Sequence, residues 1–373
     1  MNTEEPSLPG YRRVKQLLVQ QVTEGRMKPG DRITSERALA DSLGVSRLTI
    51  ARAIGELVLE GLLVRRRGSG TYVADWRRRA QENRTGQIGL ILPHTTDVPS
   101  SELIRGVTAA LRDSGLHTIL ADSSNEHAQE ASLLSSLRRD RVDGLIIMPV
   151  DGVHNIPIYH ELTYAGIPFV LVDRYLPAVD CDYVVADNHW GAFQATQWLI
   201  EHGHRRIAHF TVFNSRSSSV CQRQQGYLDA LSHHDIPRDA DLICPPSVYE
   251  HRVLAYKHAL AYVRGLEDPA TAVFAMNDSV VWATLQGAAD LGLKLPQDME
   301  LAGFFDSGSR IGVTAPFLKV SQPSFDMGRI AAEALLDAID TGMEHQTCKL
   351  SLKPSLDYSG ATEVVSTDAS IVF

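Results

Sequence analysis

Long apolar runs are missing from this chain of 373 residues. Because no stretch of about 18 apolar residues occurs, we expect no transmembrane helix and no membrane partner. The polar, acidic start of the chain, Met1–Gly10, lacks the apolar core of a secretory signal. Cysteine is scarce too, and its spacing is unlike that of a metal site. The thiols predict a reduced, cytoplasmic protein without a bound metal, and they are Cys181, Cys221, Cys244 and Cys348.

Motifs of the common enzyme classes are also absent. The chain has no Gly-x-x-x-x-Gly-Lys phosphate loop, no His-Glu-x-x-His zinc helix and no Gly-x-Ser-x-Gly nucleophile elbow. Lysine, which a pyridoxal-phosphate enzyme needs for its Schiff base, is rare beyond residue 85. The lysines found there lie in no such context: Lys257, Lys294, Lys319, Lys349 and Lys353. These absences predict a protein that is not an enzyme and has no cofactor.

Charge is distributed unevenly along the chain. The net charge of −9 at first argues against a nucleic-acid partner. Residues 1–85, however, carry 16 Lys and Arg against 10 Asp and Glu, a net charge of +6, which leaves −15 for the remainder. A basic head on an acidic body is typical of a protein that contacts phosphates at one end only.

The first 75 residues contain the pattern of a winged helix-turn-helix. Apolar residues at three- and four-residue spacing predict a helix over Tyr11–Gly25, followed by the turn residues Lys28–Asp31. Ser35 and Ser46 can each cap a further helix, and the second of these is predicted over Arg47–Glu60. Two helices joined by so short a turn form a helix-turn-helix, whose second helix would lie in the major groove of DNA.

A strand–turn–strand signal follows these helices. The apolar runs Leu62–Val64 and Thr71–Val73 flank Gly68–Gly70, which predicts a β-hairpin, the wing. Three consecutive arginines, Arg65–Arg67, lie on its first strand. We therefore expect the wing to add positive charge to the DNA-binding face.

The order of these elements resembles the GntR family of regulators over about residues 10–74. The passages that carry the resemblance are Tyr11, Lys28–Arg32, Ser35–Arg37, Val45–Arg47, Glu60–Leu63 and Gly68–Val73. The resemblance implies contacts of Arg37 and Arg47 with phosphates or base edges, and entry of the wing into the minor groove at Gly68. The full set of residues expected at DNA is Arg37, Ser46, Arg47, Thr49, Arg52, Arg66, Gly68 and Gly70.

One position in the predicted recognition helix departs from the family. The family usually has an arginine after Val-Ser-Arg-x-Thr-Val, whereas this chain has Ala51, with Arg52 next. The recognition of bases is then altered or relaxed, or Arg52, one position further round the helix, makes the contact of the missing arginine. A head that docks a protein is the other option, which its basic character disfavours.

A polar, charged stretch separates the head from the body. It contains no apolar periodicity and predicts a connector, in part helical, or a plain flexible tether. We therefore divide the chain into a winged-helix domain over residues 1–75, a linker over 76–86 and an effector domain over 87–373.

Beyond residue 87, short apolar runs alternate with helical stretches. Six runs have the composition of buried strands: Ile88–Leu92, Thr118–Leu120, Leu145–Met148, Phe169–Val172, Ile207–Phe210 and Val273–Met276. This alternation predicts an α/β fold with parallel sheets covered by helices on both faces. Because about 285 residues exceed one comfortable sheet, we expect two lobes with a cleft between them.

This part resembles the LacI family of repressors, from about residue 87 to 358. The passages that carry the resemblance are Ile167–Arg174, Val184–Asn188, His202–Ala208, Arg223–Tyr227, Ala275–Asp278 and Leu301–Phe304. The resemblance implies a two-lobed fold similar to periplasmic sugar-binding proteins, a homodimer, and a small-molecule effector between the lobes. A GntR-type head on a LacI-type body is the plan of the arabinose-repressor group.

The effector residues are implied position by position. Arg223 matches an arginine that clamps effector oxygens, Asn277 an asparagine that bonds sugar hydroxyls, and Asp151 an acidic residue of the first lobe. Each has a plainer interpretation, since Asn277 can simply cap a helix and Arg223 can lie on a helix surface. Tyr249 falls where many members place an aromatic in the cleft, although the alignment there is loose.

Two departures concern the ligand. Where sugar sensors of the family have an acidic residue, this chain has Phe305, with Asp306 after it. Pro99 and Ser100 replace the aromatics of purine-sensing members, which disfavours a purine. A neutral sugar that stacks on Phe305 is the leading hypothesis, and an anionic sugar that pairs with Arg223 is the second.

These observations predict a sequence-specific repressor. The head would bind double-stranded operator DNA, and a small hydroxylated ligand, most simply a sugar, would control that binding. The alternative is a cytosolic sugar-binding module with a vestigial head.

Overall fold

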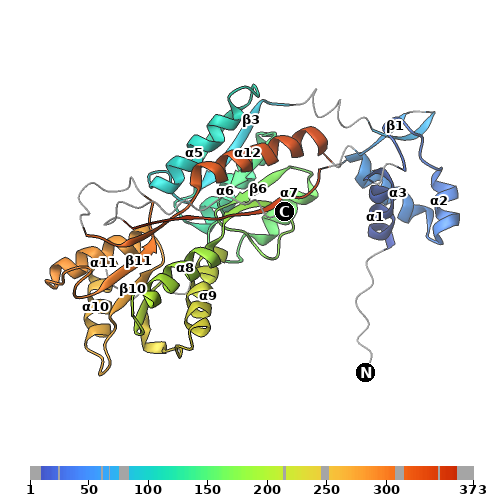
Figure 1. The fold of residues 1–373 in the computed structure, drawn as a ribbon. Coiled ribbons are helices and arrows are strands. Elements are labelled where there is room, and N and C mark those ends of the chain that lie inside the picture. The colour runs from blue at the N-terminus through green and yellow to red at the C-terminus, as the bar shows by residue number, and fades with distance from the viewer. Residues whose placement is uncertain are drawn as a thin grey trace, which may run out of the picture. The chain divides into compact units, whose positions relative to one another are not determined.

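The computed structural model describes residues 10–23, 26–59, 62–66, 68–74, 84–212, 216–244, 252–306, 315–342 and 345–358. The head and the two lobes of the body are built from separate sets of elements (Figure 1). Within these ranges, no helix has both the length and the apolar character needed to cross a membrane.

The head has the predicted helices and wing. Its elements are α1 (Gly10–Thr23), α2 (Glu36–Leu43), α3 (Arg47–Leu59), β1 (Leu63–Arg66) and β2 (Gly70–Val73). Ser35 caps α2 by accepting a hydrogen bond from the Ala38 N–H at 3.3 Å, and Gly44 ends it with φ of 64°. The apolar faces of the three helices meet in one core that includes Leu18, Ile50, Ile54 and Leu57. Strands β1 and β2 pair antiparallel.

The first lobe of the body is a parallel sheet in the order β13-β7-β6-β5-β3-β4. Its strands are β3 (Gln87–Leu92), β4 (His117–Asp122), β5 (Gly144–Ile147), β6 (Phe169–Val172), β7 (Asp182–Ala186) and β13 (Lys349–Leu352), and its helices α5 (Val98–Leu111), α6 (His127–Arg139), α7 (Ile156–Tyr164) and α12 (Ser324–Thr341). Helices α5 and α12 touch through glycines. A Cβ on Gly106 would lie 2.0 Å from the Phe325 carbonyl oxygen, and one on Gly328 would lie 2.2 Å from that of Leu103.

The second lobe is a sheet in the order β14-β12-β11-β10-β8-β9. Its elements are α8 (Asn188–Glu201), β8 (Ile207–Phe210), α9 (Ser218–His233), η1 (Ala240–Leu242), β9 (Ile243–Cys244), α10 (Arg252–Arg264), β10 (Ala272–Ala275), α11 (Asp278–Asp290), β11 (Glu300–Phe304), β12 (Leu318–Ser321) and β14 (Ser355–Tyr358). All its pairs are parallel except β12 with β14.

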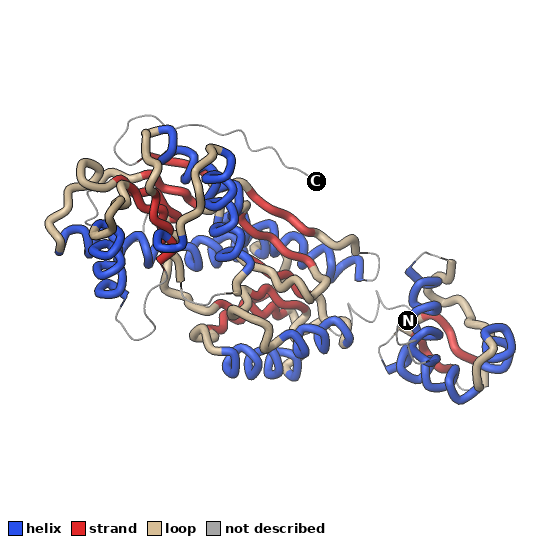
Figure 2. The backbone as a smooth tube through the Cα atoms, turned by 90° about the horizontal axis from the view of Figure 1, so that it is seen from below, coloured by secondary structure: helices blue, strands red, loops and turns tan. Residues whose placement is uncertain are grey.

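Both faces of this second sheet are covered, as predicted for a parallel sheet. Successive residues of β10 alternate between two apolar clusters. Phe274 joins Leu199 and Tyr227 of helices α8 and α9, whereas Val273 joins Tyr256 and Val281 of helices α10 and α11. Figure 2 shows these helices in blue around the red strands. The α/β fold expected from the alternating pattern is confirmed.

The chain passes between the two lobes three times. It crosses at Asp187, between β7 and α8, and crosses back at Gln322–Pro323, between β12 and α12. The third crossing, at Lys353–Pro354, joins β13 to β14. These three short segments connect the two lobes.

A histidine lies in the core of the second lobe. His209 of β8 is fully buried and stacks on Tyr227 and Phe274, with ring centroids 5.0 and 5.1 Å away. Its Nδ1 bonds the Phe274 carbonyl at 3.2 Å, while Nε2 has no partner among the described residues. Burial lowers the pKa of His209 to about 4, so the ring is neutral at physiological pH.

This burial makes a prediction for stability. Because the folded-state pKa lies below the ordinary value, the unfolded chain takes up a proton first as the pH falls. The stability linked to His209 is full above about pH 6.5 and is lost as the pH falls toward 4. Over this pH range, the free energy of unfolding of His209→Phe should fall by up to about 3 kcal/mol less than that of the wild type. Urea unfolding at pH 7, 5.5 and 4.5 measures it, with His117→Phe, at an exposed site on β4, as the control. An equal pH dependence in all three proteins would contradict the assignment.

Candidate DNA-binding surface and effector site

Helix α2 and the N-terminus of α3 carry several of the residues predicted to meet DNA. Arg37 and Arg47 are both exposed. Ser46 precedes the helix, and its hydroxyl accepts a hydrogen bond from the Thr49 N–H at 3.1 Å and lies 2.8 Å from the Thr49 hydroxyl. The cap therefore fixes the first turn of α3 and uses part of the hydrogen-bonding capacity of both hydroxyls.

Arg52 is held at the side of α3. Its guanidinium lies 4.1 Å from the centre of the Tyr11 ring on α1, and its Nε lies 3.5 Å from a carboxylate oxygen of Glu56, one turn along. Its side chain remains 63% exposed, so it can still contact a phosphate of DNA.

The wing is organised around aromatic and glycine contacts. Arg66 is exposed and stacks over the Tyr72 ring at 4.7 Å, and Arg65 pairs with Glu36 of α2 at 2.9 Å. Gly68 has φ of 75° and open space around its Cα. Gly70 has φ of 124°, and a Cβ there would lie 2.9 Å from the Arg32 Nε, which gives this glycine a packing reason besides the predicted DNA contact. Arg67 lies outside the described residues.

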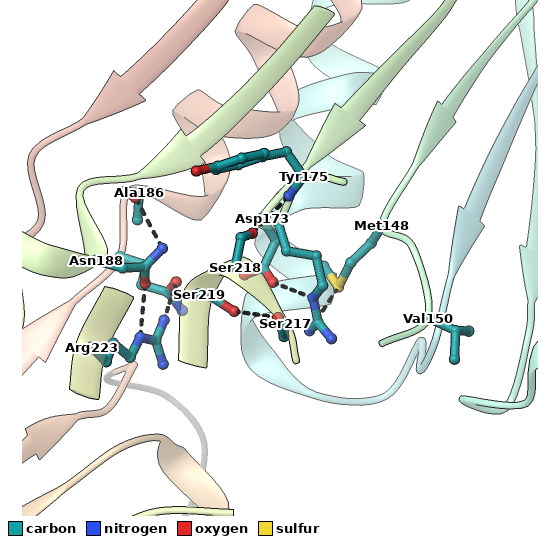
Figure 3. Close-up of polar contacts among 12 residues, drawn as sticks. Met148, Val150, Asp173, Tyr175, Ala186, Asn188, Ser217, Ser218, Ser219 and Arg223 are labelled. Carbon is teal, nitrogen blue, oxygen red and sulfur yellow. Dashed lines mark hydrogen bonds and ion pairs between the residues drawn. The ribbon is translucent and has the colours of Figure 1, made fainter. Parts of the chain in front are cut away.

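The predicted effector arginine is buried where the lobes join. Arg223 of α9 is only 4% exposed. Its Nε donates to the Asn188 side-chain oxygen at 2.7 Å (Figure 3). Its Nη1 donates to the Met276 carbonyl at 2.7 Å and its Nη2 to the Gln322 side-chain oxygen at 2.8 Å. The guanidinium also stacks over Phe304 at 3.7 Å. Arg223 is therefore not a surface residue of its helix.

Acidic side chains lie near Arg223. The loss of the family's acidic residue at Phe305 left Asp306 or Asp151 as possible partners of Arg223, and in the structure Asp306 acts on it together with Asp173 and Asp278. Burial lowers its pKa to about 10, while Asp173, Asp278 and Asp306 oppose that shift. Arg223 thus stays protonated at neutral pH, with acidic side chains close enough to act on it.

Asn277 and Asp306 lie at the carboxyl ends of neighbouring strands. Asn277 caps α11, because its side-chain oxygen accepts a hydrogen bond from the Val280 N–H at 3.0 Å. The helix-capping role that the sequence offered for this residue is thus present. The side-chain amide N–H groups can serve a ligand at the same time. Asp306 follows β11 and accepts from the Gln322 N–H at 2.9 Å. Burial and the neighbouring Asp278 raise the pKa of Asp306 to about 7.

Phe305 faces the core of the second lobe. It is 6% exposed, belongs to the apolar cluster under α10 and α11, and meets Phe317 edge-on at 5.4 Å. Its stacking on a ligand remains a prediction. An aspartate at this position would be a carboxylate inside the apolar cluster, so it would cost stability whatever it did to ligand binding.

Asp151 of the first lobe reaches the second lobe. Both of its carboxylate oxygens accept from the Arg216 N–H at 3.0 Å. The loop that carries it is held by the buried Glu130, which accepts from the Val150 N–H and from Asn155 at 2.9 Å. A second link joins the lobes where the Ser218 hydroxyl accepts from the Tyr175 N–H at 2.9 Å (Figure 3). The lobes are thus in direct contact through hydrogen bonds.

Sequence reasoning gave no role to several of these residues. Asp173 and Asn188 lie within the passages that carry the LacI resemblance, whereas Ser218 lies outside them. Asp173 has a left-handed φ of 67°, a conformation that is uncommon outside glycine. Nothing in the local pattern marked Gln322. Tyr249, which the sequence placed in the cleft, lies outside the described residues.

A cavity of about 510 Å³ opens elsewhere in the second lobe. Its lining includes Arg205, Arg206, His234 and Asp239. Arg206 is paired there with Asp239 and Asp268. The cavity lies at the amino end of β8, whereas ligands of parallel sheets bind at the carboxyl ends of strands. We therefore place the candidate effector site around Arg223.

Known proteins resemble both parts of the chain. Residues 85–351 match the family described as periplasmic binding proteins and sugar binding domain of the LacI family, and residues 10–73 match the bacterial regulatory proteins of the gntR family. The arabinose metabolism transcriptional repressor of Geobacillus stearothermophilus is 29% identical over 366 residues, which cover 97% of this chain and 100% of that repressor.

Solved structures of transcriptional regulators also resemble this chain. The complex of the transcriptional regulator CelR with cellobiose has a TM-score of 0.65 and 27% identity, covering 88% of this chain and 100% of that one. A LacI-family regulator from Enterococcus faecium with bound ribose has a TM-score of 0.60 and 27% identity, covering 73% and 96%. The chain belongs to the LacI family of periplasmic-binding-protein-like regulators, and it is a DNA-binding transcriptional regulator whose N-terminal domain is of the GntR type.

Proposed function

We propose that this protein is a cytoplasmic, homodimeric repressor without catalytic activity, and that a neutral sugar bound between its lobes controls operator binding. Residues 1–75 form the DNA-binding domain, and residues 76–86 link it to the effector domain. Residues 87–373 bind the sugar and form the dimer. The observation that carries the proposal is the buried Arg223, held by polar groups where the lobes join, in a chain whose head presents Arg37 and Arg47 on an exposed surface.

The donors and acceptors of the candidate site suit hydroxyl groups. Arg223 and Asn277 supply N–H donors, and Asp306 supplies a carboxyl acceptor. The relatives that were solved with cellobiose and ribose bind ligands of this class. Asp173 and Asp278 lie near enough to act on Arg223, so they would repel an anionic ligand that Arg223 attracts. This repulsion favours the neutral sugar over the anionic one.

A direct test uses the purified full chain and the DNA upstream of its own gene. Gel-shift titrations with and without mono- and disaccharides should show a shifted band at nanomolar protein and its loss, or its strengthening, with one sugar. Thermal-shift measurements with the same sugars report binding independently of DNA, because a bound ligand raises the melting temperature. No specific band with any duplex would leave only the alternative, a sugar-binding module with a vestigial head.

Two arginines of the head are expected to act differently on DNA. Arg47→Ala should cost about 1–3 kcal/mol in operator affinity if Arg47 contacts a base edge, and should reduce the preference for the operator. Arg66→Ala should weaken binding to all duplexes alike and lower the slope of log affinity against log salt by about 1. Fluorescence anisotropy between 50 and 300 mM salt separates the two. Unchanged operator affinity in Arg47→Ala would refute the assignment of the recognition helix.

Asn277 offers a test of the effector site. Asn277→Ser keeps an oxygen that can cap α11, since serine is a preferred capping residue, but removes the amide donor. We expect sugar affinity to fall about tenfold while the melting temperature of the free protein changes little. Isothermal calorimetry measures the first and thermal denaturation the second. Equal sugar affinity in both proteins would place Asn277 outside the site.

A further inference from the structure

A leucine is largely exposed to solvent on the helix that the proposed function places in the major groove. Leu48 is 81% exposed, more than any other large apolar side chain in the described part of the protein. It is the second residue of α3, next to the exposed Arg47. The buried residues Ile50, Ile54 and Leu57 supply the contacts of α3 with the core, so packing within the head does not account for Leu48.

The same face of α3 offers small residues below Leu48. Ala51 and Gly55 follow at spacings of three and four residues, which places all three in one stripe along the helix. Both are partly exposed. Side chains this small let a helix approach a surface closely. Arg52, the long side chain beside the stripe, is held by Tyr11 and Glu56.

The chemistry of this face fits one feature of DNA. Base edges in the major groove are polar except for the C5 methyl group of thymine, which apolar side chains contact. The exposed Arg47 next to Leu48, and the exposed Arg37 on α2, fit the phosphates that flank such a methyl group. We propose that Leu48 reads the methyl group of a thymine in the operator, in place of the arginine contact that is lost at Ala51.

This inference rests on the proposed function and can fail separately from it. The operator is first selected from random-sequence duplexes with the full chain. Each thymine of the selected site is then replaced by uracil, which lacks only the methyl group, and the affinities of the wild type and Leu48→Ala are measured at fixed salt. Leu254→Ala, at another exposed leucine on α10, is the matched control.

We expect one thymine per half-site at which uracil weakens the wild type three- to tenfold. Leu48→Ala should lose a similar factor on the thymine duplex and be insensitive to uracil at that position, while Leu254→Ala behaves as the wild type. If the wild type selects no sequence, the proposed function itself fails. If it selects an operator but Leu48→Ala responds to every uracil as the wild type does, or weakens equally on random duplexes, the inference about Leu48 is overturned.

Discussion

The buried guanidinium of Arg223 is the interaction on which the body of this regulator depends. A buried charge is tolerated when it is paired and hydrogen-bonded. Arg223 meets this condition through three donated bonds, a contact with the Phe304 ring and three surrounding carboxylates. Removing one partner would leave charge in an apolar setting, so the geometry around it is strongly constrained.

Two of its partners lie at the connections between the lobes. Asn188 comes directly after the crossing at Asp187, and Gln322 is itself part of the second crossing. The side chain expected to bind the effector is therefore bonded to segments that connect the lobes. A ligand that draws on the free N–H groups of Arg223 acts on these segments at the same time.

The lobes also touch through weaker links that a ligand can alter. Asp151 accepts from the Arg216 backbone, and Ser218 accepts from the Tyr175 backbone. A ligand changes the balance between two arrangements only through its different affinity for them. Coupling energies of about 1–3 kcal/mol are usual for such proteins and correspond to roughly 5–150-fold changes in DNA affinity.

Local patterns in the sequence predicted the elements but not the long-range contacts. Ser35 and the glycines of the wing allowed the winged-helix domain to be predicted, because helix caps and turns depend on residues that are close in sequence. Six strands of the body were not predicted, namely β7, β9, β11, β12, β13 and β14. Of these, β13 and β14 are short, partly polar edge segments. The bond from Arg223 to Gln322 spans 99 residues, and the carboxylates around Arg223 come from both lobes, so no local pattern could show them. The burial of Phe305 likewise follows from packing against Phe317.

Reciprocal linkage tests the central claim, that the site around Arg223 controls the head. The dissociation constant of the effector sugar is measured by calorimetry with the full chain alone and saturated with operator. The dissociation constant of the operator is measured with and without saturating sugar. Thermodynamic linkage requires the two ratios to be equal, and we expect each to lie between 5 and about 150. Sugar and operator that bind without changing each other's affinity would contradict the account.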